Sequence, residues 1–140
     1  MEHIAELGKS VTGFNITEQY IDCMCGKNLV KIDKCSQEII CQKPVFEKEG
    51  LSRKLTADDE RIYIYDFCTL YGFNQKNYEL IGKWKLGKDL SFDICGIAVD
   101  SNTVYCFIRN GKIITVDRQS YTRYMGNRSY VIEKVMETLN

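Results

Sequence analysis

The sequence has 140 residues, 44% of them hydrophobic and 27% charged, with 19 basic and 19 acidic side chains and a formal net charge of zero. This length and composition are typical of one folded domain with its own core, and they argue against disorder. The sequence carries no basic stripe of the kind that binds nucleic acid, and no apolar run approaches the ~20 residues that cross a bilayer. We therefore expect neither nucleic acid nor a membrane as a partner.

The N-terminus and the cysteines predict the compartment. The first six residues are partly acidic and lack the apolar core of a signal peptide. Cysteine occurs seven times, at positions 23, 25, 35, 41, 68, 95 and 106. An odd number of cysteines without a secretion signal favours free thiols and a cytoplasmic location.

Three segments of the sequence resemble one another. They start at Tyr20, Ile62 and Val104, so the spacing is 42 residues both times. Each is rich in β-branched, aromatic and apolar residues, which predicts a central strand. A repeat of this length, with strands at matching places, indicates a fold built from one recurring structural unit.

The repeats also match downstream of the central strand. A further strand ends in Asp33, Asn74 or Asp117, and a Ser or Asn follows three residues later. This punctuation is typical of turns in which a short polar side chain binds nearby backbone N–H groups. A last strand is expected at 38–41, 79–82 and 122–125.

An inner strand is expected at the start of each repeat. Asp58 and Asp100 close this strand in the second and third repeats, and Ile16 takes the aspartate's place in the first. Small residues in these strands suit a crowded position near an axis: Gly13, Ala57, Gly96 and Ala98. Two hairpins are expected, a two-residue loop at Asn110-Gly111 and a three-residue loop at Gly26-Lys27-Asn28.

The third repeat carries a family resemblance. Its sequence is Asp100-Ser101-Asn102-Thr103-Val104-Tyr105-Cys106, followed by Asn110-Gly111-Lys112-Ile113-Ile114-Thr115-Val116-Asp117. This order resembles blades of the β-propeller superfamily, nearer its quinoprotein-like and YVTN-like repeats than the WD40 type. The resemblance implies a fold and no cofactor, because propellers share their blades across unrelated functions.

Repeat and resemblance together predict an all-β chain of three four-stranded antiparallel blades in a single domain. The expected boundaries are about 9–46, about 50–90 and about 93–127. Apolar residues on one face of 130–139 predict a short C-terminal helix.

Three blades are fewer than the four to eight of natural propellers. Such an arc has an open sheet face at each end, and exposed apolar faces mark interaction surfaces. We expect a non-catalytic binding and assembly module that closes a six-bladed ring as a homodimer. Two alternatives remain open: a small-ligand-binding or enzymatic propeller with its site at the channel mouth, and a fragment of a larger propeller.

No catalytic, metal or cofactor site is expected. The only histidine is His3, so neither a Cys-His pair nor a Ser-His-Asp triad is available. Cys23 and Cys25 lack the further ligands of a metal site. In the alignment at 42 residues Cys23 falls on Tyr65, an apolar position, so we expect it to serve as a small core residue.

Three residues remain as candidates for binding. Asp58 and Asp100 lie at the turns after the inner strands, where turn formation is the ordinary explanation for aspartate. Trp84, the only tryptophan, follows an outer strand and is the best single candidate for a contact residue.

Overall fold

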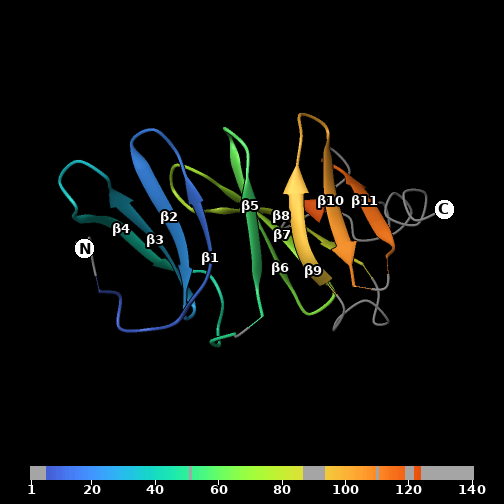
Figure 1. Ribbon diagram of the computed structural model, residues 1–140, viewed down its shortest axis with the longest axis horizontal. Helices are drawn as coiled ribbons and strands as arrows, with labels where there is room; N and C mark the ends of the chain where they lie inside the picture. The colour runs from blue at the N-terminus through green and yellow to red at the C-terminus, as the bar shows by residue number, and fades with distance from the viewer. Residues whose placement is uncertain (1–5, 51, 87–93, 110, 119–121, 124–140) are drawn as a thin grey trace.

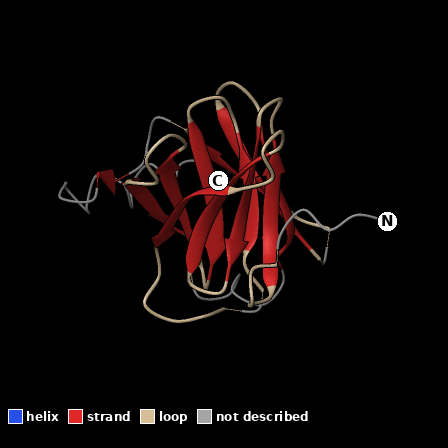
Figure 2. Ribbon diagram, turned by 90° about the vertical axis from the view of Figure 1, so that its left-hand side faces the viewer, coloured by secondary structure: helices blue, strands red, loops and turns tan. Residues whose placement is uncertain are grey.

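The computed structural model describes residues 6–50, 52–86, 94–109, 111–118 and 122–123, and every regular element among them is a β-strand. The strands form three antiparallel sheets, one for each repeat, and we call these sheets blades 1, 2 and 3 (Figures 1 and 2). No helix in the described part of the chain is long and apolar enough to cross a membrane. The helix expected at 130–139 lies outside the described residues.

Blade 1 has four strands in sequential order. They are β1 (Val11–Ile16), β2 (Tyr20–Cys25), β3 (Asn28–Asp33) and β4 (Ile39–Pro44). Cys25 pairs with Asn28, so the β2–β3 hairpin has the two-residue loop Gly26-Lys27, and the prediction of a three-residue loop was wrong. Gly26 has φ of 60°, which glycine adopts without strain.

Blades 2 and 3 differ from each other at the outer edge. Blade 2 contains β5 (Lys54–Ala57), β6 (Arg61–Asp66), β7 (Thr69–Asn74) and β8 (Leu80–Lys85). Blade 3 contains β9 (Ile94–Val99), β10 (Thr103–Ile108) and β11 (Ile113–Asp117). The two-residue strand β12 (Thr122–Arg123) pairs with β8, so it extends blade 2.

The third blade therefore differs from the expected four-stranded unit. In the described residues it has three strands, because the segment predicted as its fourth pairs with the neighbouring blade. The outer edge of β8 offers backbone donors and acceptors that any nearby strand can satisfy, so the local sequence alone does not select the partner.

The strand pairings also correct the repeat length. Tyr20 pairs with Asp33, Arg61 with Asn74, and Thr103 with Asp117. Tyr20 is thus equivalent to Arg61, and the first interval is 41 residues instead of 42. Because side chains alternate between the two faces of a strand, this one-residue slip moves every residue of β2 to the opposite face.

The corrected register changes which residues correspond. Cys23 takes the place of Ile64 and Cys106, so its role as a core residue holds although the aligned position was wrong. Thr17, and not Ile16, corresponds to Asp58 and Asp100. Its hydroxyl accepts the Tyr20 N–H at 3.0 Å, as Asp58 Oδ1 accepts the Arg61 N–H at 2.8 Å.

The predicted turns after the third strands are confirmed in blades 1 and 2. Asp33 Oδ1 accepts the N–H groups of Cys35 and Ser36 at 2.8 and 2.9 Å, and Asn74 plays the same part in blade 2. The left-handed residue follows one position later, at Gln37 (φ 63°) and Tyr78 (φ 61°). These turns reverse the chain so that β4 and β8 pair antiparallel with β3 and β7.

The inner strands β1, β5 and β9 lie side by side, as the small residues in them predicted (Figure 1). A Cβ added to Gly13 would lie 2.6 Å from Leu55 Cβ, closer than side chains approach one another.

Blades 1 and 2 enclose one apolar core, made of Met24, Leu29, Ile62, Ile64, Phe73 and Tyr78. Blades 2 and 3 enclose a second, made of Tyr63, Tyr65, Leu70, Trp84, Leu86, Ile94, Val104, Cys106, Ile108, Ile114 and Val116.

Candidate interaction faces

A cluster of polar side chains joins blade 3 to blade 2. Arg118, directly after β11, lies 3.1 Å from Asp58 Oδ2 and donates to the Tyr63 hydroxyl at 2.9 Å. It also bonds Glu60 Oε2 and the Ser101 carbonyl oxygen, at 2.9 and 3.0 Å. We call this set of contacts the Arg118 clamp. Burial and the neighbouring Asp58 raise the pKa of Tyr63, so its hydroxyl stays a donor and acceptor at neutral pH.

A different polar cluster lies between blades 1 and 2. Lys31 Nζ is 2.8 Å from Asp22 Oδ1, and the Tyr78 hydroxyl donates to the same oxygen. The Asp22 and Lys31 side chains are 0% and 10% exposed, so this is a buried ion pair. Burial, followed by the hydrogen bond to Asp22, raises the pKa of Tyr78. The ion pair lies within blade 1, and the Tyr78 hydroxyl joins blade 2 to it.

The three candidate binding residues lie apart and have different surroundings. Asp58 belongs to the Arg118 clamp. Trp84 is 1% exposed and packs 6.1 Å from the Tyr63 ring in the core, where a ligand on the surface would not reach it. Asp100 is exposed at the β9–β10 turn, and its Oδ1 accepts two backbone N–H groups. The hydrogen bonds of both aspartates confirm turn formation as their structural role.

No described strand covers the face of blade 3 that points away from blade 2, and we call it the open face of blade 3. Phe107 of β10 pairs with Ile113 of β11, and the two side chains are 36% and 58% exposed. Tyr105 lies on the same face, and its hydroxyl donates to Asp100 Oδ2 at 2.9 Å. These residues are equivalent to those with which blade 2 covers blade 3, Tyr63 and Tyr65 among them.

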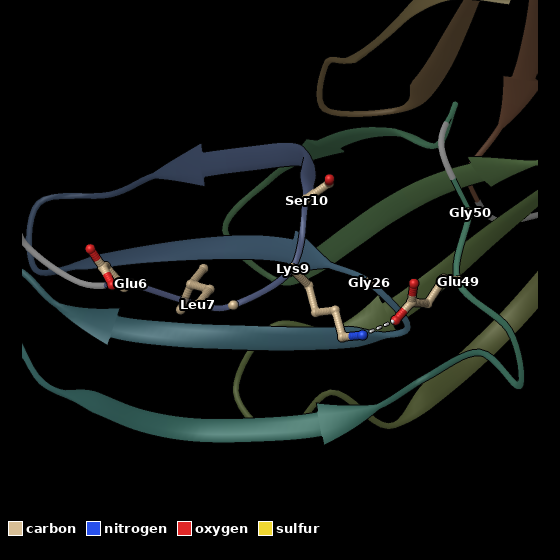
Figure 3. Close-up of a pocket in the computed structure, with 8 residues that line it drawn as sticks. Glu6, Leu7, Lys9, Ser10, Gly26, Glu49 and Gly50 are labelled. Atoms are coloured by element: carbon tan, nitrogen blue, oxygen red, sulfur yellow. Dashed lines mark ion pairs between the residues drawn. The ribbon is translucent and has the colours of Figure 1, made fainter.

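The face of blade 1 that points away from blade 2 carries an apolar cluster of its own, made of Cys23, Cys25, Val30 and Ile32. In blade 3 the same four positions are Cys106, Ile108, Ile114 and Val116, which form the blade 3 half of the core with blade 2. Leu7 packs on the blade 1 cluster, over β2 and β3 (Figure 3). Phe14 and Ile16 of the inner strand remain 61% and 57% exposed on this face.

A cavity of about 570 Å³ lies beside this face, where the N-terminal segment passes the β2–β3 hairpin (Figure 3). Three charged residues line it and all are exposed: Glu6, and Lys9 and Glu49, which pair with each other at 3.0 Å. Backbone and glycines form much of the remaining wall. The Lys9–Glu49 pair ties the N-terminal segment to the linker between β4 and β5.

Comparison with solved structures finds the same arrangement of strands at low sequence identity. The computationally designed Ika4 protein aligns with a TM-score of 0.64 at 12% identity, over 88% of this chain and 77% of that one. The β-propeller domain of Cps50 (Swd1) from Myceliophteria thermophila aligns with a TM-score of 0.60 at 15% identity, over 82% and 40%. BamB from Moraxella catarrhalis aligns with a TM-score of 0.63 at 12% identity, over 89% and 38%. These neighbours are β-propeller proteins.

The chain is a partial β-propeller. It spans about two fifths of the Cps50 and BamB structures that it matches, and three quarters of Ika4. No protein-family model and no curated protein matches its sequence. Identities this low establish the fold of the partial propeller, and any activity has to be argued from its own residues.

The cysteines of the partial propeller are structural where they are buried. Burial raises the pKa of the Cys106 thiol to about 12, and burial together with Cys25 raises that of Cys23 to about 11. Neither thiol is a ready nucleophile at neutral pH. Within the described residues no group of His, Cys, Asp and Glu side chains is arranged to hold a metal ion.

Sequence reasoning identified Asp58 but missed its partner Arg118, and it missed the Asp22–Lys31 pair altogether. The signal for the first was an arginine one residue after the strand-ending Asp117, at a turn that faces the preceding blade. The second was hidden by the shifted register, in which Asp22 aligns with Ile64 instead of Tyr63.

Proposed function

We propose that this partial propeller is a protein-interaction module that closes a six-bladed ring with a second copy of itself. The supporting observation is the apolar cluster on the open face of blade 1. Its four positions are those by which blade 3 packs on blade 2. Blade 1 thus presents half of an interblade core, and the open face of blade 3 presents the other half.

Closure places blade 3 of one copy against blade 1 of the other, at two identical seams. An interface that joins two different patches forms a closed ring when the rotation between copies allows it. The exposed apolar residues Phe14, Ile16, Phe107 and Ile113 all lie on the faces that would meet. Their burial at both seams is the driving force for association.

The inner strands are shaped for the same contact. Gly96 of β9 occupies the position of Gly13, because Phe107 pairs with Gly96 as Met24 pairs with Gly13. Gly13 lets Leu55 of the next blade approach, whereas a Cβ on Gly96 would meet nothing within 4 Å. In the ring the residue at the Leu55 position would be Phe14 of the second copy, which has room beside a glycine.

Leu7 sets a condition for closure. It packs where the second copy's blade 3 would lie, so the segment around it has to move off the centre of the face as the seam forms. Strand β1 and the end of the blade 1 face near Ile16 are exposed, so blade 3 of the second copy can make a first contact there before the segment around Leu7 moves.

Light scattering tests the proposal. We expect a particle of twice the 16.2 kDa of one chain. Phe14→Asp should abolish the dimer without unfolding the monomer, because the side chain is 61% exposed. Phe67→Asp is the matched control, since Phe67 is 69% exposed at the tip of the β6–β7 hairpin, away from both faces. A wild-type monomer at 100 µM or above—roughly a hundred times a micromolar Kd—would refute the proposal.

A further inference from the structure

The open face of blade 3 repeats the Asp58–Tyr63 part of the Arg118 clamp, with Asn102 at the position of Glu60. Tyr105 donates to Asp100 Oδ2 at 2.9 Å, as Tyr63 donates to Asp58 Oδ2 at 3.1 Å. In both blades the aspartate's other oxygen is held by the N–H groups of the following turn. The carboxylate and the phenol are therefore already oriented. Asp100 is exposed, and within the described residues no cation lies beside it as Arg118 lies beside Asp58.

Blade 1 carries a cation at the position of Arg118. Asp33 is equivalent to Asp117 by strand pairing, so the next residue, Lys34, is equivalent to Arg118. The backbone confirms this: the N–H of Lys34 donates to the Gln19 carbonyl, and the N–H of Arg118 donates to the Asn102 carbonyl, each at 2.9 Å. Lys34 is exposed, and its Nζ donates to the Thr17 carbonyl oxygen at 3.2 Å.

The junction between blades 1 and 2 shows that the residue at the Asp58 position and the residue at the Arg118 position vary together within the chain. There the acidic position is Thr17, and the position of Arg118 is Gln75, whose N–H donates to the Glu60 carbonyl at 2.9 Å. Both of these positions are thus neutral, and the Gln75 side chain donates to the Asp58 carbonyl oxygen of its own blade at 2.8 Å. Between blades 2 and 3, by contrast, Arg118 pairs with Asp58. The one remaining acidic position is Asp100, and the one remaining cation is Lys34.

We infer that Lys34 of one copy binds the Asp100 carboxylate and the Tyr105 hydroxyl of a second copy, and that this contact sets the register of the ring-closing seam. The inference rests on the proposed closure and names the polar contact that accompanies it. The apolar cores favour association in general, but they tolerate sliding of one face over the other. A charged contact at one end of the strands selects a single alignment and disfavours others.

Dimer affinity in a set of charge variants tests the contact, measured by analytical ultracentrifugation at low salt. Lys34→Glu would bring a carboxylate against Asp100 at both seams, and we expect it to weaken the dimer at least about tenfold, because repulsion of a few-fold per seam acts twice. Asp100→Asn keeps the acceptor for the turn and removes the charge. In that background Lys34→Glu should weaken the dimer much less than in the wild type.

Two further variants separate a specific contact from a general effect of charge. Lys34→Arg should tighten the dimer and reduce its sensitivity to salt, because a guanidinium can reach carboxylate and phenol together as Arg118 does. Lys76→Glu makes the same charge change at an exposed position of the equivalent turn in blade 2, and it should leave the affinity unchanged.

The outcomes distinguish the inference from the proposal on which it rests. If the wild type dimerises and Lys34→Glu weakens it equally with and without Asp100→Asn, ring closure stands and the contact is refuted. If Lys76→Glu weakens the dimer as much as Lys34→Glu, the contact is refuted as well. If the wild type is a monomer, both fall.

Discussion

Replacing Gly13 by alanine should destabilise the fold, whereas the same change at Gly96 should not. An added Cβ at Gly13 would lie 2.6 Å from Leu55 Cβ and 3.3 Å from Leu55 N, both attached to the neighbouring inner strand. Ordinary contact begins near 3.4 Å, so β1 and β5 would have to separate by close to an ångström. Overpacking of this kind costs about 1–3 kcal/mol of unfolding free energy.

Urea unfolding of the monomer measures the difference. Any gain from a less flexible unfolded chain is shared by Gly13→Ala and Gly96→Ala, so the gap between the two variants isolates the clash. To prevent dimerisation from adding to stability, both changes are made in the Phe14→Asp background. Equal stabilities for the two variants would show that the inner strands have more room than their spacing indicates, and would remove the packing argument for the equivalent glycine at the seam.

Two further predictions concern the junction of blades 2 and 3. Arg118→Met should lower the unfolding free energy by about 3 kcal/mol, because it leaves the mostly buried Asp58 carboxylate without its cation. Glu60→Gln should lower it by less than about 1 kcal/mol, because the Glu60 side chain is 67% exposed. Equal losses in urea unfolding would contradict the assignment of Asp58 as the main partner. Cys106 should react with a thiol reagent far more slowly than the exposed Cys95, since a pKa of about 12 leaves on the order of one thiolate in ten thousand at pH 8. Similar rates for the two would mean that the core opens readily.

Most of the fold could be predicted from short sequence patterns. Strands rich in β-branched and aromatic residues, and turns whose Asp or Asn side chain binds the backbone, were recognisable because each depends on a few neighbouring residues. Asp33 and Asn74 at their turns and the small residues of the inner strands were found in this way. The blade to which the strand predicted at 122–125 belongs was not recognisable. The described strand β12 (Thr122–Arg123) pairs with β8 of blade 2, and its own two residues do not specify that partner.

The register of β2 shows how one residue separates a correct fold from a correct site. Aligning Tyr20 with Ile62 instead of Arg61 keeps every strand in place and exchanges its two faces. Asp22 then appears to lie among the residues of the opposite face, and Lys31 loses its partner. The pairing across the hairpin, in which Cys25 lies opposite Asn28, is a property of two strands together that the periodicity of either strand alone does not contain.

The residues that matter for assembly are those at which the repeats disagree. Positions that keep one role in the blades, such as the turn acceptors Asp33 and Asn74, build each unit alone. The position after the third strand varies from lysine to glutamine to arginine, and the arginine pairs with Asp58 of the preceding blade. If the affinity of the Lys34 and Asp100 variants follows that same rule between copies, then the order of blades in the ring is encoded by side chains that differ, on a backbone that repeats.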